Sequence, residues 1–188
     1  MEQPKQPERD SMDMAWGMNP EDLHKTSGDL QEFMKQQCAQ FKAPEGKRVK
    51  FTFFALASDL VMDFDHDLLG QAVQILLNNS LMFSPSDCRI KVFVDKTLKH
   101  GSIRISDNGI GLPEEAKEHM FDPVVSDDDP GVCLHIVKDI VTAHGGTVTG
   151  DNNAGGGSVF TITLPLDGVP IDDDVEEAVL MDDDEVVE

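Results

Sequence analysis

The feature that most constrains the fold is a run of 19 residues without a charged side chain, Leu68–Ser86. Its length would suit a membrane-spanning helix, but it contains two Gln, two Asn, three Ser and one Pro, which are costly in lipid. We therefore predict a helix buried in a protein core, from about Asp67 to Phe83. It should end at Ser84-Pro85, because the residue before a proline is steered away from helical backbone.

Short strands and further helices surround this central helix. A helix over residues 29–41 places Leu30, Phe33, Met34, Cys38 and Phe41 on one face, which needs a partner surface. The other predicted helices are Glu114–His119 and Pro130–His144, and the predicted strands are Val49–Ala55, Val61–Phe64, Arg89–Val94, Ser102–Ser106, Thr147–Thr149 and Ser158–Leu164. Strands and helices do not alternate regularly, so we expect an α+β fold, a two-layer sandwich with one mixed sheet and helices on one face.

The composition divides the chain into four parts. Residues 1–19 are rich in Pro, Gln and charge, and we expect them to be disordered. Residues 20–45 should form the amphipathic helix and a turn, and residues 46–166 the folded domain. Residues 167–188 hold 11 acidic residues and no basic one, and we expect an acidic, disordered tail.

The formal net charge of −21 argues against binding to nucleic-acid phosphates or to an anionic membrane surface, so we expect no nucleic-acid partner and, with the polar composition of Leu68–Ser86, no insertion into a membrane. The three cysteines form no CxxC pair, which argues against a disulfide framework or a zinc site. The N-terminus has no apolar segment typical of a signal peptide. Together these features predict a cytoplasmic location.

The sequence DNGIGLP at 107–113 carries a candidate binding site. Asp107 follows a predicted strand, where its carboxylate can accept a hydrogen bond from an exocyclic amine. Gly109 and Gly111 would let a flat ring approach the backbone, since no Cβ stands in the way. A plain Asn-Gly turn would have a similar sequence, so the surrounding segments decide between the two interpretations.

Those segments are LLNNSLMFSP at 76–85, FDPV at 121–124, GVCLHIVKDIVTAHGG at 131–146 and GGGSVFTITLP at 155–165. In this order and spacing, residues 46–166 resemble the ATP-binding catalytic domain of sensor histidine kinases. That domain belongs to the GHKL superfamily, with gyrase, the large heat-shock chaperone and the mismatch-repair ATPases. The resemblance implies the Bergerat type of α/β sandwich, with ATP or ADP and Mg²⁺ as ligands.

The resemblance also assigns roles to individual residues. Asn79 would coordinate Mg²⁺, Asp107 would bind the adenine amine, and Gly109 and Gly111 would shape the adenine pocket. Phe83 would stack on the base or flank it. Ordinary core packing is an equally good interpretation of that phenylalanine.

Further along the chain, the resemblance implies that Phe121 anchors a lid and that Gly131 begins the phosphate-binding helix. The strand Ser158–Leu164 would form the floor of the pocket. Core packing is again the alternative for Phe121 and Phe160.

Several positions depart from the family pattern. Ile75 replaces a polar residue that is the water-activating Glu of gyrase-like members, so hydrolysis of that type is not expected. Met82 replaces a Lys that meets phosphate. In the last glycine box, usually GxGLGL, Asp129-Pro130 precede Gly131 and two of three glycines are replaced. Asp129 would cap the helix and compete with phosphate there.

Two other features of this region bear on the ligand. The segment from Phe121 to Gly131 is short for a lid and contains no Lys or Arg. Asp127, Asp128 and Asp129 could alternatively hold Mg²⁺.

A histidine kinase also needs a phospho-accepting His, and the residues after His24 do not match the family's box. Autophosphorylation in cis is therefore not expected, and no catalytic residue is assigned. We predict a histidine kinase-like ATP-binding protein of two-component signalling, impaired in nucleotide binding or a pseudokinase, whose partner is a response regulator or a separate His-bearing kinase. The alternatives are a competent kinase acting in trans on a His- or Ser-bearing protein, and an interaction module that needs no nucleotide.

Overall fold

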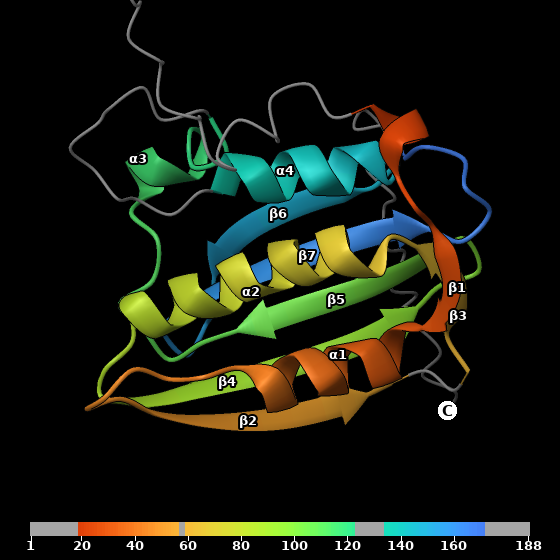
Figure 1. The fold of residues 1–188 in the computed structure, drawn as a ribbon. Helices are drawn as coiled ribbons and strands as arrows, with labels where there is room; N and C mark the ends of the chain where they lie inside the picture. Colours follow the sequence, from red (N-terminus) through yellow and green to blue (C-terminus); the bar gives the residue numbers. More distant parts are fainter. Residues whose placement is uncertain (1–18, 57–58, 123–133, 172–188) are drawn as a thin grey trace, which may run out of the picture.

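The computed structural model describes residues 19–56, 59–122 and 134–171, which form a layered α+β fold (Figure 1). Its main sheet has five strands in the order β2 (Arg48–Ala55), β4 (Asp87–Lys96), β5 (His100–Ser106), β7 (Ser158–Pro165) and β6 (Thr147–Asn152). The β2–β4 pair is parallel and the other pairs are antiparallel, so the sheet is mixed, as predicted.

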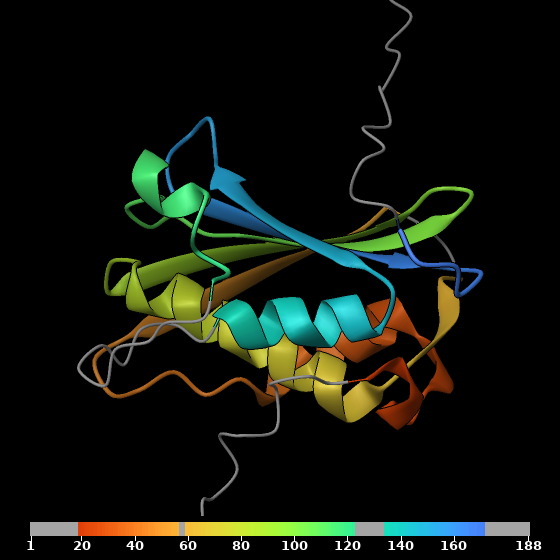
Figure 2. The same cartoon turned by 90° about the horizontal axis from the view of Figure 1, so that it is seen from above.

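Three helices cover one face of this sheet, α1 (Leu30–Gln40), α2 (His66–Met82) and α4 (Leu134–Ala143) (Figure 2). The strands alternate accordingly. In β4, Ile90 and Val92 are buried under the helices, whereas Arg89 and Lys91 are exposed on the opposite face. The predicted two-layer sandwich is confirmed.

Aspartates start the first two of these helices. The Asp29 carboxylate accepts hydrogen bonds from the backbone N–H groups of Gln31 and Glu32, at 2.8 and 3.0 Å. Asp65 does the same for Asp67 and Leu68, at 3.1 and 3.0 Å. Each carboxylate satisfies N–H groups that have no partner within the helix, and its charge suits the positive end of the helix dipole.

The amphipathic helix α1 finds the partner surface that its sequence requires. Leu30, Phe33 and Met34 are buried, and the Gln74 side chain of α2 donates hydrogen bonds to the Gln37 carbonyl and side-chain oxygens. Helix α1 is therefore packed onto the domain.

A second, two-stranded sheet was not predicted. Strand β1 (Thr26–Asp29) pairs antiparallel with β3 (Val61–Phe64), and the 3₁₀ helix η1 (Pro20–Asp22) precedes it. Gly28 faces the His66 imidazole, and a Cβ at this glycine would lie 2.6 Å from that ring. A larger residue here would require the exposed His66 ring to move away.

The remaining boundaries differ modestly from the predictions. Helix α3 (Glu114–Lys117) is shorter than predicted, and β6 extends to Asn152 rather than Thr149. The predicted helix start at Pro130 lies outside the described residues, as do residues 1–18 and 172–188 of the predicted disordered segments 1–19 and 167–188. The start of the second segment is described, and there Ile171 N–H donates to Gly145 O at 2.9 Å. Within the described part of the chain, no helix has the length and apolar character needed to cross a bilayer.

Candidate functional site

The Asp107 carboxylate lies at the end of β5 and is only 6% exposed. Its Oδ1 accepts hydrogen bonds from the backbone N–H groups of Gly109 at 2.8 Å and Ser158 at 3.1 Å. Its Oδ2 accepts one from the Ser158 hydroxyl at 2.5 Å. Two carboxylate oxygens offer about four acceptor positions, so Asp107 is fixed in place and retains capacity for one further donor.

Gly109 brings the loop after β5 onto the end of α2. A Cβ at this glycine would lie 2.6 Å from the Phe83 carbonyl oxygen, a contact that no other residue could make without movement. The same carbonyl accepts a hydrogen bond from Ile110 N–H at 3.2 Å, and Phe83 N–H donates to Asn79 O at 3.3 Å. The structure thus joins Asn79, Phe83, Gly109 and Asp107 into one region.

The Asn79 side chain is buried, at 4% exposure, and its Oδ1 has no hydrogen-bond partner among the described residues. The same holds for the hydroxyl oxygen of Ser80. A buried polar atom without a partner is costly, and such atoms in a native fold point to a ligand or water. A neutral carboxamide oxygen is a ligand that Mg²⁺ accepts, so Asn79 fits its predicted role.

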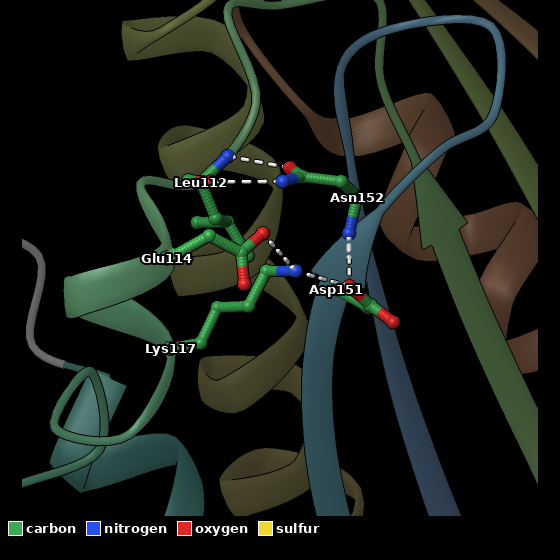
Figure 3. Close-up of polar contacts among 5 residues, drawn as sticks. All are labelled: Leu112, Glu114, Lys117, Asp151 and Asn152. Atoms are coloured by element: carbon green, nitrogen blue, oxygen red, sulfur yellow. Dashed lines mark hydrogen bonds and ion pairs between the residues drawn. The ribbon is translucent and has the colours of Figure 1, made fainter.

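Gly111 adopts φ of +81°, a conformation that favours glycine. A Cβ here would lie 2.7 Å from Asn152 Oδ1 in β6. That oxygen accepts a hydrogen bond from Leu112 N–H at 2.6 Å, and Asn152 Nδ2 donates to Leu112 O at 2.8 Å (Figure 3). The glycine therefore fixes the path of the loop toward β6.

Lys117 holds α3 to the same strand. Its ammonium lies 2.8 Å from the Glu114 carboxylate and 2.7 Å from the Asp151 carboxylate (Figure 3). The hydrogen bond to Asp151, followed by that to Glu114, raises the pKa of Lys117, and the same contact lowers the pKa of Asp151. Both groups therefore stay charged at neutral pH.

Lys47 was not predicted to take part, yet it fixes the end of α2. Its ammonium donates hydrogen bonds to the carbonyl oxygens of Leu81 and Ser84, each at 2.7 Å. A cation here satisfies carbonyl groups that the helix leaves unpaired and suits the negative end of the helix dipole. No local sequence signal links Lys47 to a segment 34 residues away.

The predicted aromatic residues have different environments. The Phe83 side chain is 44% exposed, so its ring is accessible to a planar ligand. Phe160 is fully buried, which favours core packing over direct contact with a ligand at that position. Phe121 is partly buried and packs against the core.

The two substituted positions on α2 also differ. Ile75 is partly buried and packs against the core. Met82 is 57% exposed, beside Phe83, and offers no charge at the position where the resemblance implies a lysine.

Several predicted site residues lie outside the described residues, namely Gly131 and the aspartates Asp127, Asp128 and Asp129. Elsewhere, in residues 19–56, 59–122 and 134–171, no group of three or more His, Cys, Asp or Glu side chains is arranged to hold a metal. Ser158 was predicted only as the start of the strand that forms the pocket floor, and its hydrogen bonds to Asp107 were not predicted. Asn152, which binds the glycine loop, was not predicted as a site residue.

Comparison with known proteins agrees with this geometry. The family described as "Histidine kinase-, DNA gyrase B-, and HSP90-like ATPase" matches residues 64–168, more than half of the chain. Hybrid signal transduction histidine kinase D of Dictyostelium discoideum is 32% identical over 142 residues, which cover 69% of this chain and 9% of that protein. Sensor histidine kinase WalK of Bacillus subtilis is 30% identical over 143 residues, 71% of this chain and 23% of that protein.

The chain thus spans less than a quarter of the length of these two relatives. Among solved structures, the catalytic domain of histidine kinase ThkA has a TM-score of 0.69 at 23% identity, covering 77% of this chain and 97% of that domain. Histidine kinase ThkA in complex with response regulator protein TrrA has a TM-score of 0.63 at 24% identity, covering 76% and 42%. The chain belongs to the family of histidine kinase-, DNA gyrase B- and HSP90-like ATPases, and within it resembles the ATP-binding domain of sensor histidine kinases.

Proposed function

We propose that the chain is the ATP-binding domain of a histidine kinase-type signalling protein and that it binds ATP and ADP weakly, through an intact adenine pocket and an impaired phosphate site. The observation that carries the proposal is the Asp107 carboxylate, which is fixed by Gly109 and Ser158 and keeps an acceptor position for the adenine amine. The exposed ring of Phe83 lies beside the same loop.

Asn79 is the residue that would hold Mg²⁺, because its buried Oδ1 has no partner among the described residues. When bound, Mg²⁺ neutralises charge on the nucleotide's phosphate oxygens. The protein would contribute the Asn79 Oδ1 atom, which is already in place one helical turn before Phe83. This feature also supports the second candidate, a competent kinase that acts in trans on a separate His- or Ser-bearing protein.

The proposed impairment rests on charges. Met82 supplies no cation to the phosphates. In the sequence, Asp129 takes the position where backbone N–H groups of the family's glycine box would meet phosphate, and a carboxylate there repels the ligand. Both changes weaken the hold on the γ-phosphate more than the hold on adenine.

The proposed partner is a response regulator or a separate His-bearing kinase, met in the cytoplasm. The solved complex of ThkA with TrrA is an example of a kinase of this fold bound to a response regulator protein. An interaction module that needs no nucleotide is the remaining alternative, and the following titration separates the three.

Calorimetric titration with ATP and ADP at a fixed Mg²⁺ concentration tests the proposal. We expect similar, weak dissociation constants for both nucleotides and loss of binding in Asp107→Asn, because the amide presents a donor to the adenine amine. The matched control is Asp63→Asn, since Asp63 is exposed and lies on β3. A strong preference for ATP would contradict the impaired phosphate site, and failure to bind either nucleotide would contradict the adenine pocket.

A further inference from the structure

The sheet face opposite the helices carries an unusual concentration of positive charge. Five exposed residues form this surface, called the basic face below, namely Arg48, Lys50, Arg89, Lys91 and Arg104. They are five of the 15 basic residues in a chain whose net charge is −21. The surface lies on the other side of the sheet from Asn79 and α2, and it meets the proposed nucleotide site at Asp107, which also lines the cleft on this face.

Most of the charge on the basic face is uncompensated. Arg48 pairs with Asp87 at 2.7 Å, but within the described residues the other four cations form no ion pair. Lys50 lies directly opposite Arg89 in the register of β2 and β4. Like charges in this position repel each other, so an anion on this face would stabilise the sheet.

The basic face is also hollowed and partly apolar. A cleft of about 540 Å³ is lined by Arg89, Lys91, Phe93, Arg104, by Asp107 at its end, and by the loop that contains Gly155 and Gly156. The Arg104 guanidinium lies 4.9 Å from the centre of the Phe93 ring, and Phe54 stacks on Phe93 at 4.6 Å. The cleft therefore suits a ligand that combines carboxylates with aliphatic groups.

The C-terminal segment 172–188 of this chain has that composition. It contains ten acidic residues and no basic one, interspersed with Val, Leu, Met and Ala. We propose that residues 172–188 dock onto the basic face of the same chain and occupy its cleft. Charge complementarity selects this acidic segment, and its aliphatic side chains match the Phe54–Phe93 pair.

The tether makes this contact easy to reach in cis. Ile171 is the last described residue before the segment, and its N–H donates to Gly145 O at 2.9 Å. Gly145 in turn lies against Pro165 at the end of β7, since a Cβ at this glycine would lie 3.5 Å from the Pro165 ring. The segment therefore starts near the end of β7. Pro165 is four residues from Thr161, which lines the cleft, so the separation along the strand is about 13 Å. Seventeen residues span up to about 56 Å when extended. Because the segment is covalently attached close to the cleft, its effective concentration there is on the order of millimolar. This favours docking in cis over binding of a separate acidic partner.

The test uses the full chain and a labelled peptide with the sequence of residues 172–188. A tail-neutral variant of the full chain replaces the ten carboxylates of this segment by their amides, at Asp172, Asp173, Asp174, Glu176, Glu177, Asp182, Asp183, Asp184, Glu185 and Glu188. By fluorescence anisotropy, we expect the peptide to bind the tail-neutral variant at least about tenfold more tightly than the natural chain, whose own tail competes.

Charge reversal then locates the contact. Adding Arg89→Glu and Lys91→Glu to the tail-neutral variant should weaken peptide binding at least about tenfold. The control pair Lys42→Glu and Lys138→Glu makes the same charge change at exposed residues outside the basic face and should leave affinity nearly unchanged. Thermal melts of each variant establish that it is folded.

Three outcomes would overturn the proposal. The peptide could fail to bind the tail-neutral variant, it could bind the natural and tail-neutral chains equally, or the control pair could weaken binding as much as Arg89→Glu with Lys91→Glu. Sedimentation of the natural chain adds a fourth, because a dimer that dissociates in the tail-neutral variant would show docking between copies instead of in cis.

Discussion

At the scale of single residues, His144 and Asp65 form a buried, hydrogen-bonded polar pair. His144 is buried, its Nδ1 donates to Ile140 O at 2.7 Å, and its Nε2 accepts from Asp65 N–H at 3.0 Å. Only a neutral imidazole can make both bonds. Burial lowers the pKa of His144. Burial alone would raise the pKa of Asp65, but backbone N–H groups of Leu68, His24 and Asp67 outweigh it and the pKa is lowered.

This arrangement predicts a pH dependence of stability. The unfolded chain binds a proton at His144 near the ordinary pKa of 6.5, whereas the folded chain resists protonation there. The free energy of unfolding should therefore be fully retained above pH 6.5 and fall as the pH drops toward the lowered folded pKa. Urea unfolding between pH 7.5 and 5.5 measures this fall. It should be smaller in His144→Gln and persist in His119→Gln, which removes an exposed imidazole. Equal slopes in all three proteins would contradict the assignment.

At the scale of elements, helix α2 is fixed at both ends by residues distant in sequence. Asp65 caps its start and also accepts a hydrogen bond from His24 N–H at 2.8 Å, while Lys47 binds the carbonyl oxygens at its end. The end held by Lys47 carries Asn79 and Phe83, so the geometry of the proposed site depends on a residue outside the site.

Replacing Lys47 by Met should destabilise the fold by about 1–3 kcal/mol, because two partly buried carbonyl oxygens lose a charged donor. Chemical denaturation measures the difference. Lys42→Met serves as the matched control, since Lys42 is exposed and lies before the turn that leads into β2. A loss no larger than that of the control would mean that water replaces the ammonium without cost.

The elements that the sequence predicted well are those with a local signal. Helices α1 and α2 contain apolar residues at helical spacing, and each starts directly after an N-cap aspartate, Asp29 or Asp65. Strand β1 was missed because Thr26–Asp29 has no apolar alternation and exists through its pairing with β3. In the same way Asp107 could be predicted from its motif, whereas its hydrogen bond with Ser158, 51 residues away, could not.

At the scale of the whole molecule, the folded body is larger than the region that the family comparison matches. That match covers residues 64–168, whereas α1, β1 and β2 precede it. These elements cover part of α2 and supply the parallel partner of β4. Without them, buried side chains such as Leu69 and Ile90 would lose cover, and β4 would become an edge strand open to aggregation.

We therefore expect residues 64–168 alone to be unfolded or aggregated, while residues 19–171 fold cooperatively. Thermal melting followed by circular dichroism compares the two pieces under the same conditions. A cooperative transition of similar midpoint in the shorter piece would show that α1 and β2 are accessory to the core.

Cys88 of β4 is buried against α2, and this burial controls how fast its thiol can react. Its thiol is 1% exposed and lies 3.9 Å from Ser80 O, and burial raises its pKa, with the Asp107 charge acting in the same direction. A reagent in solution can reach this sulfur only when the end of α2 separates from the sheet. The rate of its chemical modification is therefore set by the frequency of that opening, and a ligand held by Asn79 and Asp107 would slow it without touching the sulfur.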